Sequence, residues 1–533
     1  MRRYGVLVMK GSILLSRPLY AVQSAVCAAV LCMSMAGCNV GPKYKPPAMT
    51  APPAFKESST GDKDGDGWKV AQPQDAALRG KWWEIYNEPE LNALEDELNV
   101  DNQNIRQSFE NFMEARALVR EARSQYFPTV SIGPSYSRSQ TSANIRSGAS
   151  SVSGTGGTAT TATTTAVPSG QQTQIFALPA DVSWEPDLWD RVRNTVRSNQ
   201  YSAQLSAADL ENERLIEQAS LAEYFFEIRG QDMLQKILNE TVDADKKALE
   251  SERGRYETGV DDQISLVEAQ TTLDSAQSAA INIGVARSQY EHAIATLVGK
   301  PASDFSIPVR PLTPTPPPIP VGLPSQLLER RPDVAAAERN MAAANAQIGV
   351  AYAAFYPALT ISGGGGVEST AIKNLLEWPS RFWSVGPSIS QTIYDGGLRR
   401  ATVNQYIAAY NADLAAYRQS VLTAFQQVED YLAQVRILSQ QTLRQEQAVD
   451  SARTFLKLET VRYDTGVDPY IDVVTAQTTL LSNQQTLTNL QVQEMTASVE
   501  LIQALGGGWD RSQLPTPAQI TAKPSHTETV IQH

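Results

Sequence analysis

The sequence predicts a mainly α-helical protein that also carries membrane β-strands. Two long stretches lack proline, and shorter segments alternate between apolar and polar residues. No proline lies between Pro186 and Pro301, and neither proline nor glycine lies between Gly397 and Gly466. At 1.5 Å per residue, a helix over 398–463 spans roughly 95–100 Å, about three times the ~30 Å hydrocarbon thickness of a bilayer. Its many polar residues predict a partly wet helix that packs on neighbouring helices.

Four segments show the period of two that is typical of strands. In 129–137, for example, Val130, Ile132 and Tyr136 alternate with serine and threonine. Apolar residues on one side and polar residues on the other, over roughly ten residues, is the pattern of a transmembrane β-barrel. Half-buried strands of a soluble sheet are the alternative, which four such segments in an exported chain disfavour. The predicted strands are about 127–139, 175–188, 357–367 and 384–394.

The body of the chain contains an internal sequence repeat. Arg255–Val260 recurs as Arg462–Val467 at an offset of 207 residues, and Ala269–Leu273 recurs unchanged at the same offset. Each copy predicts helix, strand, loop, strand, very long helix, turn and helix. The predicted organisation is a lipoprotein signal peptide (1–37), a lipidated N-terminal segment (38–90), a first repeat (91–307), a proline-rich linker (308–324), a second repeat (325–509) and a flexible C-terminal tail (510–533).

The N-terminus has the layout of a secretory signal. Residues 1–37 contain four bases and no acid, and an apolar stretch ends in small residues. The run Met35-Ala36-Gly37-Cys38 resembles the processing box of bacterial lipoproteins, in which the cysteine becomes the acylated first residue. An ordinary signal peptide with a chance cysteine is the alternative. Asn39 is not the aspartate that signals inner-membrane retention in such lipoproteins, so we expect sorting to the outer membrane.

Composition disfavours enzymes and nucleic-acid binders. All three cysteines lie in the first 38 residues, and His292 is the one histidine in the body. No phosphate-binding glycine loop, HExxH motif or nucleophile elbow is present. We therefore expect no catalytic residue, no metal and no cofactor apart from the lipid on Cys38. Loss of the signal changes the net charge from −12 to −16, which argues against nucleic acid.

Four strands cannot close a membrane barrel, because open edges are not tolerated in lipid. The chain must therefore pool its strands with other copies, in a closed ring by preference. Two chains would give eight strands and three would give twelve, and the residues alone do not choose between them.

Several motifs, in order, carry a family resemblance from about Cys38 to Trp509. They are Gly41-Pro42-Lys43-Tyr44, Trp82-Trp83, Trp184–Arg191, Leu328–Asp333, Ala346–Gly349 with Phe355–Pro357, and the two Arg-Tyr-x-Thr-Gly-Val turns. With them the chain resembles the TolC-like outer-membrane factors of tripartite efflux systems, in the lipoprotein (NodT) branch.

This resemblance implies a homotrimer with a twelve-stranded β-barrel in the outer membrane, continuous with a helical barrel that reaches into the periplasm. It also implies two partners, a periplasmic membrane-fusion adaptor and an inner-membrane pump, most often of the resistance–nodulation–division class. Such a protein is a passive duct for small molecules and not an enzyme. A duct for protein or peptide secretion through an ABC transporter, and a lipid-anchored coiled-coil scaffold without a pore, remain alternatives.

In this architecture the two repeated turns lie at the helical tips. The expected adaptor-contact residues are Arg255, Tyr256, Gly259, Val260, Gly466 and Val467. The expected periplasmic gate residues are Arg462, Tyr463, Asp464 and Asp468. Carboxylate rings favour cations and can gate a pore, and Arg462 and Tyr463 could hold neighbouring helices together. The alternative for each position is a solvated turn residue without a further role.

Overall fold

The computed structural model describes residues 40–49, 51–57, 80–140, 172–313, 316–319 and 327–522. Cys38, the predicted signal peptide and most of the predicted loop after the first strand lie outside these ranges. The chain forms two compact units, of which unit 1 takes residues 1–43, 120–198 and 345–407 and unit 2 takes the rest. Each unit combines segments of both sequence repeats, so the repeats are not separate compact bodies. Within the described residues, no helix is long and apolar enough to cross a membrane.

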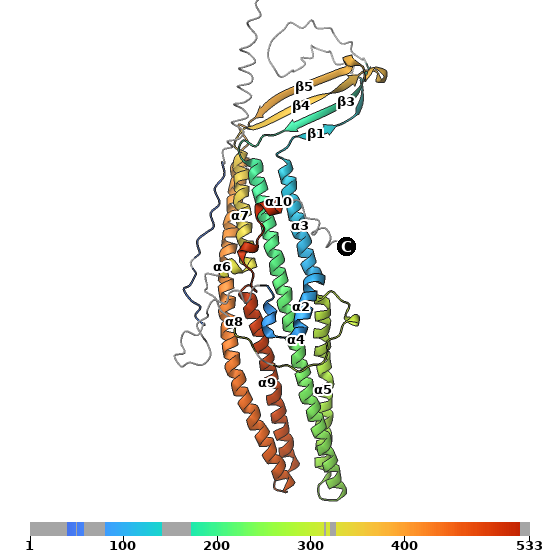
Figure 1. The fold of residues 1–533 in the computed structure, drawn as a ribbon, viewed down its shortest axis with the longest axis vertical. Helices are drawn as coiled ribbons and strands as arrows, with labels where there is room; N and C mark the ends of the chain where they lie inside the picture. The colour runs from blue at the N-terminus through green and yellow to red at the C-terminus, as the bar shows by residue number, and fades with distance from the viewer. Residues whose placement is uncertain are drawn as a thin grey trace, which may run out of the picture. The chain divides into compact units, whose positions relative to one another are not determined.

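Unit 1 contains one antiparallel sheet, in which the two repeats pair with each other (Figure 1). Strand β3 pairs with β4 from Phe176↔Ser369 to Trp184↔Ile361, and this ladder joins the first repeat to the second. The strand order is β1-β3-β4-β5, with β2 also paired to β3. The strands are β1 (Thr129–Ile132), β2 (Ser135–Gln140), β3 (Gln172–Trp184), β4 (Ala358–Ser369) and β5 (Arg381–Ser390).

The register separates an apolar from a polar face of this sheet. The row Val130–Val182–Gly363–Val385 lies on the apolar face, and the neighbouring row Ser131–Asp181–Gly364–Ser384 lies on the polar face. The four charged residues of the strands divide between the faces by sign. Asp181 and Glu368 lie on the polar face, whereas Arg138 and Arg381 lie on the apolar face. The alternation seen in the sequence is therefore a real two-faced sheet.

All four predicted strands have different limits in the structure. The expected strand at 175–188 is β3 over 172–184, and the one at 357–367 is β4 over 358–369. The expected strand at 127–139 is broken into β1 and β2 at Gly133 and Pro134. The Gly133 N–H still donates to Pro179 O (3.2 Å), but neither Pro179 nor Pro134 has an N–H to donate to the ladder. The expected strand at 384–394 runs from Arg381 to Ser390. Its end coincides with the pair Ala358↔Ser390, beyond which Pro357 cannot continue the ladder.

Unit 2 holds two long helical hairpins and the shorter helices that pack on them. Figure 1 shows α4 followed by α5, and α8 followed by α9. The main core of this unit includes Trp82 of the N-terminal segment, Leu98, Phe225 and Ile294 of the first repeat, and Ile502 of the second. Four of the helices (α3, α4, α7 and α8) contribute residues to both units. The helices of more than one turn are α2 (Pro89–Asp101), α3 (Gln103–Ser124), α4 (Arg191–Glu257), α5 (Gln263–Leu297), α7 (Pro332–Ala353), α8 (Leu398–Asp464), α9 (Tyr470–Ala504) and the short α10 (Pro517–Thr521).

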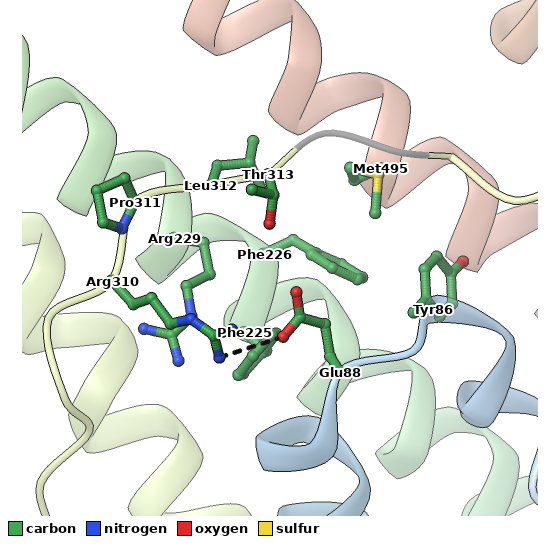
Figure 2. A pocket seen from close by; sticks show the side chains of 10 residues that line it. All are labelled: Tyr86, Glu88, Phe225, Phe226, Arg229, Arg310, Pro311, Leu312, Thr313 and Met495. Carbon is green, nitrogen blue, oxygen red and sulfur yellow. Dashed lines mark ion pairs between the residues drawn. The ribbon is translucent and has the colours of Figure 1, made fainter.

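The beginning of the linker between the repeats is clamped to the first repeat. Asp232 and Arg229 are almost fully buried. The Asp232 carboxylate accepts from the Arg310 N–H (2.8 Å), and Arg229 donates to Pro308 O (2.7 Å). Figure 2 shows Arg310 and Glu88 joined as an ion pair (3.5 Å) beside a cavity of about 10 Å³, the size of one water. Charged side chains thus satisfy the backbone of a segment that cannot form a helix.

The predicted flexible tail at 510–533 is ordered as far as Ala522, which corrects that expectation. Residues Pro517–Thr521 form α10, and Ile520 is fully buried against Val119 and Ala203. The buried Arg116 donates to the carbonyls of Gln519 (3.3 Å), Ile520 (3.4 Å) and Ala522 (3.3 Å). A buried arginine that caps these carbonyls fixes the segment. Residues 523–533 lie outside the described ranges.

We predict that Gly366→Ala weakens the β3–β4 ladder. A Cβ at this position would lie 2.2 Å from Leu178 O and 2.9 Å from Pro179 Cα, so backbone would have to move. Overpacking of this kind costs about 1–3 kcal/mol. The measurement is the midpoint of thermal unfolding in detergent. The control is Gly386→Ala on β5, where a Cβ meets nothing within 4 Å. Equal midpoints for the two variants would contradict the prediction.

Candidate functional site: the tips of the two helical hairpins

Both repeated turns end a long helix in the same way. Gly259 and Gly466 have φ of +70° and +74°, a left-handed conformation that glycine adopts without steric cost. In the first turn the Val260 N–H donates to Arg255 O (2.9 Å), and the Gly259 N–H donates to Tyr256 O (3.0 Å). The second turn repeats both bonds 207 residues later. This is the Schellman motif, which satisfies the last carbonyls of a helix.

Each tip also repeats an arginine–aspartate pair six residues apart. Arg462 donates two hydrogen bonds to Asp468, one of them Nη2 to Oδ1 at 2.9 Å. Arg255 Nε lies 3.4 Å from Asp261 Oδ2. The bonds from Arg462, whose side chain is 55% exposed, lower the pKa of Asp468. Because Arg462 reaches an aspartate of its own turn, it does not hold a neighbouring helix within the chain.

Tyr463 connects the two hairpins. Its ring is 7% exposed, and its hydroxyl donates to Glu252 Oε1 on α4 at 2.6 Å. Asp261 Oδ2 lies 3.2 Å from the same hydroxyl. The Arg255 guanidinium covers the ring at 4.7 Å from its centroid, which is cation–π geometry. Burial and the bond to Glu252 raise the pKa of Tyr463, so the phenol stays protonated and remains a donor.

Two acids of α4 are buried in this region, and only Glu252 bonds Tyr463; the sequence motifs did not point to either of them. Glu252 and Asp245 are 1% and 2% exposed. They alternate with Val242 and Leu249, so acids occupy positions of an apolar stripe with 3,4,3 spacing. That interruption is the signal that could have identified them. Neither oxygen of Asp245 has a hydrogen-bond partner. Burial raises the pKa of Asp245 to about 6.

The other predicted tip residues are exposed. Tyr256 is 42% exposed, and Val260 and Val467 are 67% and 65% exposed. Asp464 has no ion pair or hydrogen bond of its side chain within the described part of the chain. The structure therefore brings together Arg255, Tyr463 and Asp261 across the hairpins, and Arg462 with Asp468 inside one turn. It leaves the remaining side chains facing solvent.

One group of three carboxylates among the described residues has ligand atoms close enough to hold a cation. Oxygens of Glu459, Asp468 and Asp472 lie within 4.8 Å of one another. Burial and the neighbouring Asp468 raise the pKa of Glu459. Arg462 already supplies a positive charge to this group, so its negative charge is partly neutralised without a metal.

Comparisons with known proteins agree with this architecture. The sequence pattern of the family described as "Outer membrane efflux protein" matches residues 94–300 and 323–507. The chain belongs to the outer membrane efflux protein family. It is located in the outer membrane, and the resemblance to TolC-like factors drawn from the sequence motifs is confirmed. The matched ranges are the two sequence repeats within a few residues, so the family's pattern covers both.

Named relatives support the same assignment. The probable efflux pump outer membrane protein TtgC of Pseudomonas putida is 28% identical over 497 residues, with 91% of this chain and 96% of that protein covered. The outer membrane protein OprJ of Pseudomonas aeruginosa is 29% identical over 498 residues, with coverage of 92% and 96%. The relatives and this chain are therefore alike along almost their whole lengths.

Solved structures confirm the TolC-like fold. The outer-membrane channel OprN aligns with a TM-score of 0.76 at 25% identity, covering 89% of this chain and 100% of that one. VceC of Vibrio cholerae aligns with a TM-score of 0.71 at 24% identity, covering 80% and 99%. The mainly helical body with a small sheet is thus the architecture of these channels.

We predict that Asp245→Asn stabilises the protein at neutral pH. A carboxyl whose pKa is higher folded than unfolded favours folding at low pH, and that contribution is lost as pH rises from about 4 to about 6. Two pKa units correspond to about 3 kcal/mol as an upper bound. Thermal unfolding at pH 7.5 and pH 4.5 measures the effect, and we expect the variant to raise the midpoint clearly more at pH 7.5 than at pH 4.5, where only part of the contribution is lost.

The matched control for this prediction is Asp243→Asn. Asp243 lies on the same helix, but its side chain is 69% exposed and pairs with Lys246. We expect this variant to follow the wild type at both pH values. If the unfolding midpoint of Asp245→Asn also equals that of the wild type, burial of the ionised Asp245 carboxylate does not destabilise the protein.

Proposed function

We propose that this chain is the outer-membrane channel of a tripartite efflux pump and that it works as a homotrimer. If β1 and β2 are counted as one interrupted strand, each chain has four strands. Three copies would then supply twelve and so close a barrel without open edges. The two-faced sheet supports this proposal most directly. Its apolar row of valines suits lipid, and its polar row of serine, aspartate and glycine suits a water-filled passage. Transport is passive, and the energy comes from the pump.

The cargo in this proposal is small molecules. The related proteins are named for efflux of antibiotics, of solvents and of toluene. Protein or peptide secretion through an ABC transporter is the alternative cargo class. A strain that lacks this chain would become more sensitive to such compounds in the first case and would lose a secreted protein in the second.

The partners in this proposal meet the hairpin tips. The exposed side chains of Val260 and Tyr256 at the first turn and of Val467 at the second offer apolar contacts, and the Schellman glycines Gly259 and Gly466 keep these turns compact. A periplasmic adaptor docking here would connect the chain to an inner-membrane pump of the resistance–nodulation–division class. Arg255 contacts Tyr463 and Asp261 instead, so in this proposal it stabilises the structure of the tip and does not contact the adaptor.

The gate in this proposal is the contact set at the same tips. Tyr463 fastens α8 to α4 through Glu252, and Arg462 fastens its own turn through Asp468. Asp464 is a free carboxylate that adds negative charge at the passage. A single exposed ion pair is worth about 0–1 kcal/mol, but threefold symmetry repeats each contact around the ring.

The decisive experiment is conductance of the purified protein in a planar bilayer. We expect a low-conductance channel for the wild type and a clearly higher closed-state conductance for Arg462→Ala and for Asp468→Ala, because each variant removes the bidentate pair. Arg453→Ala serves as the control, because Arg453 forms an exposed ion pair on α8 nine residues before Arg462, farther from the tip. No channel at all would favour the scaffold alternative. Channels with wild-type conductance in both tip variants would reject their gate role.

We also propose that Cys38 carries the lipid anchor. Metabolic labelling with a radioactive fatty acid should mark the wild type, and Cys38→Ala should abolish the label, because the acylated residue is lost. Cys32→Ala is the control, since that residue leaves with the signal peptide. Label that persists in Cys38→Ala would contradict lipidation at this position.

A further inference from the structure

The contact between the hairpins is made by four residues that all recur in the other repeat. Glu252, Arg255 and Asp261 of the first repeat surround Tyr463 of the second. Adding 207 to the first three numbers gives Glu459, Arg462 and Asp468, and subtracting 207 from the fourth gives Tyr256. Each residue type is unchanged. The chain therefore carries two complete sets of the same site, of which only one is assembled within a single copy.

In the second set, the three residues Glu459, Arg462 and Asp468 already lie together within one copy. Arg462 pairs with Asp468, and the Glu459 and Asp468 carboxylates lie within 4.8 Å of each other. Arg462 donates to Asp468 through the N–H groups at one edge of its guanidinium, and its side chain is 55% exposed, so a ring can approach it. The same residue types receive Tyr463 at the other tip, where its hydroxyl lies between Glu252 and Asp261. At the second tip, among the described residues, no tyrosine lies there, and Glu459 and Arg462 both contact Asp468 directly.

The fourth residue of the second set is exposed. The Tyr256 side chain is 42% exposed, and its hydroxyl has no hydrogen bond among the described residues. By contrast, Tyr463 is 7% exposed and bonded. Two residues at equivalent positions of equivalent turns thus differ in one respect, which is that Tyr463 has a neighbouring hairpin of the other repeat.

We propose that Tyr256 of a second copy of this chain docks against Glu459, Arg462 and Asp468. This inference rests on the proposed homotrimer. A ring of three duplicated chains alternates first-repeat and second-repeat hairpins, so contacts within a copy and contacts between copies are related by the repeat. The tyrosine hydroxyl donates to Glu459, and its ring covers the Arg462 guanidinium, as Tyr463 does with Glu252 and Arg255.

The two sites are not identical, and the differences weaken the contact between copies. Ser265, which donates to Asp261 (3.1 Å), is replaced by Asp472 at the equivalent position. The site between copies therefore holds three carboxylates and one guanidinium. Like charges held this close repel one another, so this contact separates before the contact inside a copy.

The test is a short bismaleimide cross-link between cysteines placed at the two positions, in native membranes. The chain's other cysteines are Cys27, Cys32 and Cys38. We expect Tyr256→Cys combined with Glu459→Cys to give covalent dimers and trimers on denaturing gels. The matched control, Tyr463→Cys with Glu252→Cys, should cross-link within one chain and stay monomeric. Absence of cross-linked dimers and trimers for the first pair, in a protein that a lysine-reactive cross-linker shows to be trimeric, would overturn this inference but leave the proposed homotrimer standing.

A second measurement separates docking from simple proximity. Tyr256→Phe keeps the ring but removes the hydroxyl, so we expect it to raise the closed-state conductance in a planar bilayer, as Tyr463→Phe should. A Tyr256→Phe channel with the wild-type conductance, beside a Tyr463→Phe channel with a raised one, would overturn the proposed hydrogen bond. A protein that is neither trimeric nor conductive would instead overturn the proposed function.

Discussion

The pairing of β3 with β4 is the constraint on which the rest of the structure depends. These two strands belong to different repeats, and their ladder runs over nine residue pairs. Without it each repeat would keep an open hairpin with an unpaired edge, which is unstable in water and not tolerated in lipid. Helices α4 and α8 begin shortly after β3 and β5, so the same pairing decides which long helices are available to each other. Duplication of the sequence has produced one interdependent protomer.

The same duplication explains why the tips are alike in their backbone and different in their contacts. Backbone bonds at Gly259 and Gly466 are local, so identical turn sequences form identical Schellman motifs. Side-chain contacts depend on the neighbour as well. Tyr463 meets the α4 hairpin inside the chain and is buried, whereas Tyr256 faces solvent. The same sequence motif thus gives a buried, hydrogen-bonded tyrosine in one repeat and an exposed tyrosine in the other.

Much of this architecture follows from the sequence, because its signals are periodic. A long stretch without proline predicts α4, and one without proline or glycine predicts α8; the residues Leu398–Tyr463 differ from the observed helix by one residue at its end. Features that depend on single residues were less accessible. Pro134 breaks one predicted strand, and Pro357 ends the ladder of another. The order of the segment that precedes Ala522 depends on Arg116, which lies about 400 positions earlier in the chain, so no local pattern could predict it.

The candidate site was predictable in its location but not in its chemistry. Turn residues mark the tips directly, whereas Glu252 and Asp245 are acids placed on an apolar stripe, and their burial depends on how the hairpins meet. The Arg462–Asp468 pair illustrates the limit in the other direction. Its residue types favour a contact between helices, but a spacing of six residues across a tight turn lets the two side chains reach each other first.

Unit 2 contains cores of very different strength, and this difference bears on how a gate can move. The main core gathers large side chains such as Trp82, Phe225 and Ile502. The cluster near the tips is small, and it includes Tyr463 and Tyr470 beside the unbonded carboxylate of Asp245. Burial and the Asp245 charge raise the pKa of Tyr470 to about 12, which shows how poorly this region accommodates negative charge.

A contact that buries uncompensated charge is easily lost, since its net contribution to stability is small. The hairpins can therefore separate at their tips while the main core stays intact, because regions with few apolar contacts open at a lower free energy than the core. One of the buried acids, Glu252, orients Tyr463, whereas Asp245 has no hydrogen-bond partner. A weak but specific contact is what a closed passage requires if an arriving partner is to open it by binding energy alone.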